Sequence, residues 1–111
     1  MGDIPILSQV LHKAVTGDSW ILMTSQSMEH AIKQGATVYY KRVPFNSLQV
    51  NDIIVFGKPS NETTYNEVIV HRIVAVEIGW LVTKGDFNNA NDPWKVDASL
   101  LIGKVTEIHN P

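Results

Sequence analysis

The sequence predicts a mainly β protein, a small antiparallel fold with one short helix near its N-terminus. Three observations indicate this class. From residue 20 onward, short apolar runs rich in β-branched and aromatic residues recur along the chain. Clusters of Gly, Pro and Asn separate these runs, as turns do. Helical spacing of apolar residues is confined mainly to the region before Gly17.

An amphipathic helix is expected over residues 4–15. Pro5 suits its first turn and Gly17 its end. Its apolar residues recur at helical spacing: Leu7, Val10, Leu11 and Ala14. The favoured interpretation is a helix that caps a β core, and the alternative is a helix that docks on a membrane or a partner.

Six strands are expected after this helix. Gly79 suggests a hairpin between the fourth and fifth, and Gly103 suggests a bulge in the last. A second short helix is considered at Met28–Gln34. The expected strands are Trp20–Met23, Val38–Lys41, Asp52–Phe56, Glu67–Ile78, Trp80–Thr83 and Leu101–Ile108.

Length and composition indicate one domain over residues 1–111, with the N-terminal helix in 1–16 and the β core in 17–108. The chain has 111 residues, 44% of them apolar, and neither repeat nor linker. No cysteine is present, which excludes disulfides and a cysteine nucleophile. The net charge is −2 without a basic stripe, so a nucleic-acid partner is not expected.

The sequence also bears on membranes and cofactors. Apolar runs fall short of the roughly 18–20 residues that span a bilayer, and the N-terminus lacks the pattern of a signal peptide. The chain itself is therefore expected to be soluble. The histidines lack ligand-like spacing and no glycine-rich phosphate loop occurs, so neither a metal nor another cofactor is expected.

Serine and histidine side chains provide the first candidates for chemistry. Ser27 lies in a small polar cluster, Thr24–Glu29, that follows an apolar strand. A serine hydroxyl is a poor nucleophile without a neighbouring base. His71 lies inside an apolar strand, where low polarity favours the neutral imidazole that can act as a base. Alone, each residue has a simpler interpretation, a turn serine and a core histidine.

An acidic loop provides a third candidate. Asp86 follows Gly85, and Asp92 precedes Pro93. A carboxylate in contact with the imidazole would hold its tautomer and stabilise the imidazolium ion. Either residue could instead be an ordinary turn aspartate, and spacing does not decide which of them faces His71.

Taken together, four motifs resemble type I signal peptidases of the archaeal and endoplasmic-reticulum branch. That family has motifs similar to Ser-x-Ser-Met-Glu-Pro, Gly-Asp-Ile-Val-Val-Phe, Val-His-Arg-Val and Thr-Lys-Gly-Asp-Asn-Asn. The corresponding segments here stand in the same order: Ser25-Gln26-Ser27-Met28-Glu29-His30, Asn51-Asp52-Ile53-Ile54-Val55-Phe56, Val70-His71-Arg72-Ile73 and Thr83-Lys84-Gly85-Asp86-Phe87-Asn88-Asn89. The resemblance extends over residues 17–108. Near its end, Leu101–Val105 is similar to the last strand of the family.

The resemblance implies a signal-peptidase-like β fold and a serine endopeptidase. Ser27 corresponds to the nucleophile, His71 to the general base and Asp92 to the third triad member. Asp86 corresponds to a supporting aspartate, and Ser25 to an oxyanion-hole hydroxyl. The implied reaction removes signal peptides from exported precursors by acyl-enzyme hydrolysis after small residues, at a membrane surface on the extracytoplasmic or lumenal side, with partner subunits in some members.

The chain departs from the family pattern at several positions. His30 replaces a proline, Ala36 replaces an aspartate, and Phe87 interrupts the Gly-Asp-Asn-Asn run. The family's transmembrane helix before the nucleophile is also missing, which is expected of a trimmed catalytic domain or of a soluble or degenerate relative. Two alternatives are a non-catalytic binding or assembly module of the same fold and a phage-repressor-type peptidase that cleaves itself or one dedicated protein. His71 argues against the latter, which uses a lysine base.

Overall fold

The structure is a computed structural model that describes residues 19–59 and 67–111. The helix expected over residues 4–15 lies outside the described residues. In the described part of the chain, the protein is mainly β, as the sequence predicts, and its only helical element is a short 3₁₀ turn, η1 (Phe45–Ser47). No helix within these residues is long and apolar enough to cross a membrane.

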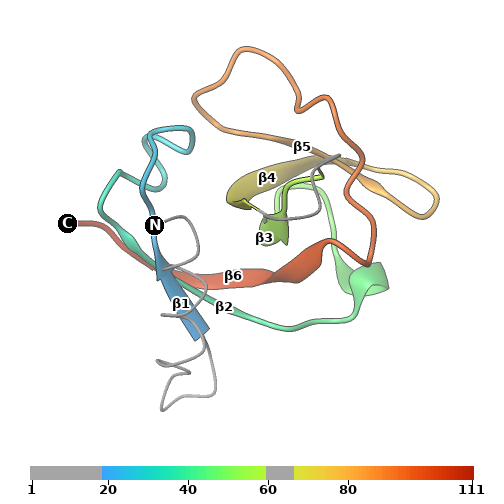
Figure 1. The fold of residues 1–111 in the computed structure, drawn as a ribbon, viewed down its shortest axis with the longest axis horizontal. Helices are drawn as coiled ribbons and strands as arrows, with labels where there is room; N and C mark the ends of the chain where they lie inside the picture. The colour runs from blue at the N-terminus through green and yellow to red at the C-terminus, as the bar shows by residue number, and fades with distance from the viewer. Residues whose placement is uncertain (1–18, 60–66) are drawn as a thin grey trace.

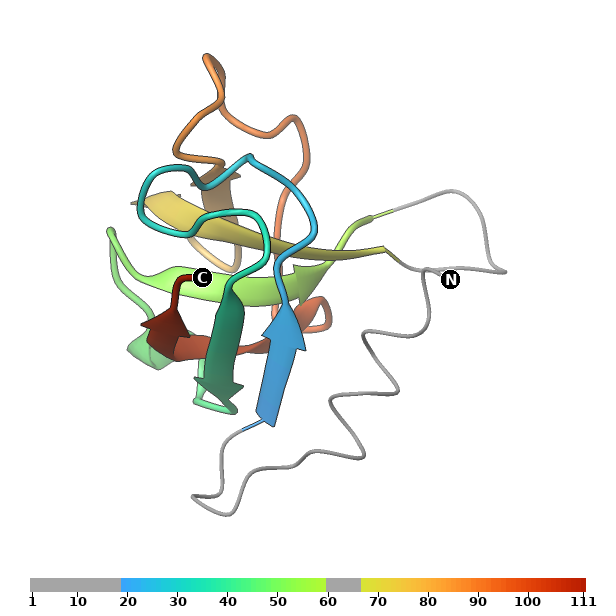
Figure 2. The same cartoon turned by 90° about the vertical axis from the view of Figure 1, so that its left-hand side faces the viewer.

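The six strands of residues 19–59 and 67–111 belong to one antiparallel sheet, whose spatial order is β1-β2-β6-β3-β4-β5. Figures 1 and 2 show that this sheet is strongly curved, with the β1–β2 loop and the loop after β5 close together. The strands are β1 (Ser19–Leu22), β2 (Thr37–Lys41), β3 (Ile53–Gly57), β4 (Val68–Val76), β5 (Leu81–Lys84) and β6 (Leu101–His109).

Strands β3 and β4 are buried on both faces because their side chains alternate between two hydrophobic clusters. Val55 and Val70 belong to the cluster under β1 and β2, which also contains Met28 and Ile32 from the β1–β2 loop. The alternate positions face the other cluster, which is closed by β5 and the chain after it: Ile54, Phe56, Ile73, Leu81 and Val96. This double burial makes β3 and β4 the fixed centre of the molecule.

Two local expectations of the sequence have different outcomes. The bulge suggested by Gly103 is confirmed, since Val55 pairs with Gly103 and Phe56 with Leu101, which leaves one extra residue on β6. The short helix considered at Met28–Gln34 is wrong, because this segment forms turns.

The failure of that helix has a specific cause in its backbone hydrogen bonds. Only Ile32 bonds to the carbonyl four residues earlier, that of Met28, at 2.9 Å. The N–H groups of Lys33 and Gln34 instead bond to the side chains of Asn110 and Glu29, at 2.9 and 3.2 Å. Side-chain acceptors therefore replace the helical carbonyls, and the helix does not form.

Candidate active site

Ser27 lies in the loop that joins β1 to β2. The base of this loop is closed by two hydrogen bonds between Met23 and the chain just before β2, from Met23 N to Ala36 O and from Gly35 N to Met23 O, both 2.8 Å. Met28, next to Ser27, is fully buried and anchors the loop in the core. The nucleophile candidate therefore lies on an exposed loop that is fixed from below.

His71 lies in the middle of β4, paired with Ile54 of β3. It is one of two buried polar residues in the described part of the chain, with 6% exposure. Its ring meets Phe56 edge-on, with centroids 6.4 Å apart. Burial in a central strand leaves the imidazole little freedom to turn away from its hydrogen-bond partners.

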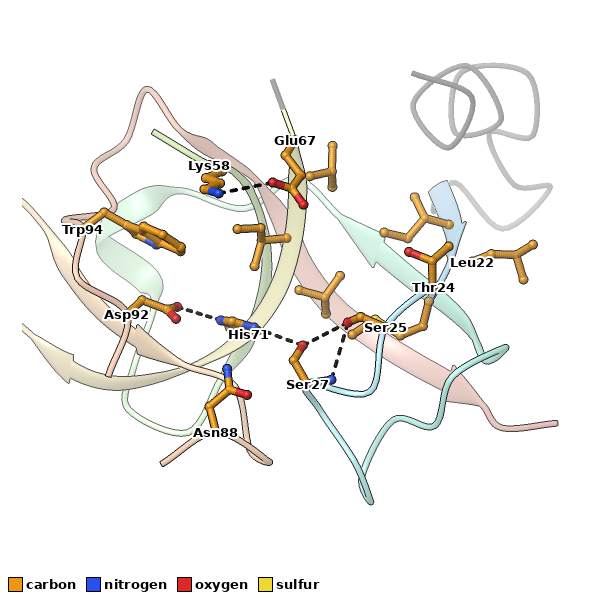
Figure 3. A pocket seen from close by; sticks show the side chains of 15 residues that line it. Leu22, Thr24, Ser25, Ser27, Lys58, Glu67, His71, Asn88, Asp92 and Trp94 are labelled. Atoms are coloured by element: carbon orange, nitrogen blue, oxygen red, sulfur yellow. Dashed lines mark hydrogen bonds and ion pairs between the residues drawn. The ribbon is translucent and has the colours of Figure 1, made fainter. Parts of the chain in front are cut away.

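Both ring nitrogens of His71 have partners that the sequence had identified as candidates. Nε2 lies 3.1 Å from Ser27 Oγ, and Nδ1 lies 2.6 Å from Asp92 Oδ2. The three side chains form one row, which Figure 3 shows at the edge of a cleft. A serine, an imidazole and a carboxylate in this order are the elements of a Ser-His-Asp triad.

Asp92 is held by β5 as well as by His71. Its backbone N–H donates to the Thr83 carbonyl at 2.8 Å, and its Oδ2 accepts the Thr83 hydroxyl at 2.7 Å. The Asp92 side chain is only 7% exposed. These bonds fix the carboxylate opposite Nδ1, and a carboxylate here favours the tautomer that carries its proton on Nδ1.

Asp86, the other candidate aspartate, contacts Arg72 instead of His71. Its carboxylate accepts two hydrogen bonds from Arg72, at 2.9 Å from Nε and 2.8 Å from Nη2. Arg72 also donates to the Asn51 carbonyl. The hydrogen bond to Asp86 is the main reason why the pKa of Arg72 lies above its ordinary value. Asp86 therefore ties its loop to β4 through Arg72.

Ser25 lies beside the nucleophile candidate. Its hydroxyl is 3.1 Å from Ser27 Oγ and accepts a long hydrogen bond, 3.4 Å, from the Ser27 backbone N–H. A hydroxyl and a backbone N–H on the same side of the nucleophile are the groups that an oxyanion hole requires. The geometry is therefore consistent with the position that the sequence assigned to Ser25.

Gly85 lies where these loops approach each other most closely. A Cβ on this residue would come within 2.7 Å of the Ser27 carbonyl oxygen and 2.9 Å of His71 Nε2. Two residues further on, the Phe87 backbone N–H donates to that same carbonyl at 2.9 Å. The loop after β5 thus packs directly against the nucleophile loop, and only glycine leaves enough space at this point.

A cleft of about 610 Å³ opens beside the triad row. One wall is the end of β1 and the start of its loop, from Ile21 to Ser25, and the other is the start of β4, Val68–His71. Lys58, Glu67 and Trp94 line its remaining side. The curvature of the sheet allows β1 and β4, which are not neighbours in the strand order, to face each other across the cleft.

Sequence reasoning missed several residues of this region. Thr83 was included in a motif but not recognised as the partner of Asp92. Asn88 was likewise part of a motif, yet its position beside His71 was not foreseen. Lys58 and Glu67 form an ion pair at 3.4 Å, and Lys58 lies 5.6 Å from the centroid of the Trp94 ring. Only the three-dimensional fold brings these residues to one cleft.

Within residues 19–59 and 67–111, no group of three or more His, Asp or Glu side chains is arranged to hold a metal ion. The candidate site consists of side-chain and backbone groups of the chain itself. Comparisons of the chain with protein-family models, with curated proteins and with solved structures found no match.

Proposed function

We propose that this protein is a serine endopeptidase that removes signal peptides from exported precursor proteins. The observation that carries the proposal is the hydrogen-bonded row of Ser27, His71 and Asp92 beside a cleft. The resemblance of four motifs to type I signal peptidases supports the substrate class, and the row supports the reaction.

In the first step, Ser27 Oγ attacks the carbonyl carbon of the scissile peptide bond. His71 Nε2 accepts the hydroxyl proton as the new C–O bond forms, and the Asp92 carboxylate stabilises the resulting imidazolium ion through Nδ1. The carbonyl oxygen becomes an oxyanion, which accepts hydrogen bonds from the Ser27 backbone N–H and the Ser25 hydroxyl. These donors must turn from their present contacts toward the substrate.

In the second step, the C–N bond breaks and Nε2 returns the proton to the leaving amine. The precursor's N-terminal part remains as an ester on Ser27. Water then attacks this ester, His71 accepts a proton from the water, and Ser27 regains its hydroxyl as the acid leaves. The row of three side chains is sufficient for both steps, without a cofactor.

The cleft is suited to an extended peptide. β1 is the end strand of the sheet, and Val68–Val70 of β4 pair with β3, whereas β5 pairs with β4 only from Arg72 onward. A peptide lying between these edges could bond to both through its backbone. The walls include Ile21, Met23 and Val70, whose apolar side chains favour small apolar residues before the scissile bond.

The proposed substrate also indicates where in the cell the protein would act. Exported precursors reach a signal peptidase with their apolar segments in a membrane, so the site would act at a membrane surface on the extracytoplasmic or lumenal side. Precursors are the proposed partners, and further subunits of such an assembly are a part of the same proposal.

The proposal is tested by cleavage of a synthetic precursor that contains an Ala-x-Ala site, presented in detergent or lipid. Ser27→Ala should lower kcat/KM by about 10⁴-fold or more, since the acyl-enzyme cannot form. His71→Ala should have a similar effect, and His71→Lys should not restore activity because the Asp92 contact is lost. Ser47→Ala, a surface serine on η1, is the matched control and should retain full activity.

Equal cleavage by the wild type and Ser27→Ala would reject Ser27 as the nucleophile. Binding of the precursor by both proteins, with no cleavage by either, would instead support the alternative of a non-catalytic binding or assembly module. Product masses from mass spectrometry identify the cleaved bond and separate these outcomes.

A further inference from the structure

We propose that Phe87 and Asn88 form a subsite that selects an apolar residue immediately after the scissile bond. The inference rests on the proposed peptidase function and adds a specificity that the motif resemblance does not imply. Phe87 is one of the positions where the chain departs from the family pattern, so the subsite is a property of this chain.

The triad row divides the surroundings of the site into two sides. Figure 3 shows Lys58 and Glu67 on one side of the row and Asn88 on the other, and all three residues line the cleft. A peptide that reacts with Ser27 has one half before and one half after the reacting carbonyl. If one half lies along Lys58 and Glu67, the other half continues across the row toward Asn88.

The proton path indicates which half passes Asn88. The leaving nitrogen must come close to His71 Nε2, because Nε2 gives it a proton. Nε2 and the Asn88 amide nitrogen both lie next to Gly85, at 2.9 and 2.6 Å from the position of a Cβ on that residue. The leaving half therefore starts beside the loop after β5, where the Asn88 amide can bond to its backbone.

Phe87, the residue before Asn88, presents an aromatic surface next to the loop that carries Ser27. Its side chain is 59% exposed, although its backbone N–H is fixed by the Ser27 carbonyl at 2.9 Å. Its ring packs edge-on against His30, with centroids 6.0 Å apart and an interplanar angle of 82°. An aromatic ring that is held in place but still exposed offers a firm contact for an apolar side chain.

The experiment uses the full chain and peptides that share an Ala-x-Ala segment but carry Phe, Leu, Gly or Asp after the scissile bond. Wild type should cleave the Phe peptide with a kcat/KM about five- to tenfold above that of the Asp peptide, as expected for a half-exposed apolar contact. In Phe87→Ala, this ratio should fall to about two or less, while Phe87→Leu should keep most of it.

Ile78→Ala is the matched control, since Ile78 is a fully exposed apolar residue in the β4–β5 turn. It should leave the ratio unchanged. A Phe87→Ala variant that loses activity equally on all four peptides would overturn the subsite, because an equal loss indicates a structural role. The same conclusion follows if the wild type shows no preference.

An ester of the same Ala-x-Ala segment with a nitrophenol leaving group separates this proposal from the preceding one. Ser27-dependent turnover of the ester, with peptides that are cleaved without preference, would reject the subsite and leave the peptidase function intact. If neither ester nor peptide is turned over in a Ser27-dependent way, both proposals fail.

Discussion

The loop after β5 carries two aspartates, whose carboxylates contact two successive residues of β4. Asp92 bonds to His71, and Asp86 bonds to Arg72. Because successive residues of a strand point to opposite faces, the first pair reaches Ser27 and the second lies apart from it. The same type of side chain thus serves one pair within the candidate site and one ion pair outside it.

The exposure of the two pairs fits this division. His71 and Asp92 side chains are each 7% exposed, whereas Arg72 and Asp86 are 28% and 24% exposed. Arg72 binds Asp86 through two parallel N–H···O bonds, the bidentate geometry that makes a guanidinium–carboxylate pair strong and specific. The more buried pair has instead a single bond on each imidazole nitrogen, which suits a base that must gain and lose a proton.

Of the changes that separate the two pairs, exchanging each aspartate for asparagine should show the largest difference. Asp92→Asn should lower kcat by about 10³- to 10⁴-fold, because the imidazole loses the acceptor that fixes its tautomer. Asp86→Asn should lower kcat by less than about tenfold and instead reduce the free energy of unfolding by about 1–3 kcal/mol. Kinetics on the synthetic precursor and urea denaturation measure the two quantities, and a reversed pattern would contradict the division of roles.

A smaller effect is expected at Gly85, between the two aspartates and the nucleophile. In Gly85→Ala, the new methyl group would lie 2.7 Å from the Ser27 carbonyl oxygen, so the backbone of one loop must shift. We expect kcat/KM to fall about 10- to 100-fold, since displacement of a reacting group by about 1 Å has effects of this size. Gly57→Ala, at the end of β3 where the nearest atom to a Cβ is the Leu100 carbonyl oxygen at 4.0 Å, controls for the loss of a glycine. Unchanged kinetics in Gly85→Ala would mean that the contact between the loops is not needed.

The pH dependence of catalysis also follows from the difference between the two pairs. Hydrogen bonding to Asp86 raises the pKa of Arg72, so the guanidinium stays charged over the whole pH range of the measurement. Only neutral His71 can accept the Ser27 proton. At low pH, kcat/KM should therefore rise about tenfold for each unit by which the pH is increased, and it should then reach a plateau. A flat profile between pH 5 and 8, measured on a substrate without titratable groups, would count against a histidine base.

Much of the fold could be predicted from the sequence because the strands are short, apolar and separated by turn residues. The six strands occur where expected, with ends displaced by one or two residues. The choice between Asp92 and Asp86 could not be made, since both lie in one loop and their partners depend on which face of β4 each reaches. The cleft could not be predicted either, because Lys58 and Trp94 meet only when the sheet curves.

Residues 28–34 illustrate a different limit of prediction. Their composition permits a helix, yet Glu29 and Asn110 take the backbone N–H groups that a helix would use. Asn110 lies at the far end of the chain, so no local pattern could reveal this competition. The resulting irregular loop keeps Ser27 on the surface while Met28 remains buried.

The hydrogen bond from Phe87 N–H to the Ser27 carbonyl links the nucleophile's own residue to the loop that carries both aspartates. Neither loop can therefore swing outward alone without breaking this bond and uncovering Gly85. The bond thus couples the position of Ser27 to that of the loop that supplies Asp92. A complete row of Ser27, His71 and Asp92 therefore requires that the loop after β5, which carries Asp92, is packed against the loop that carries Ser27.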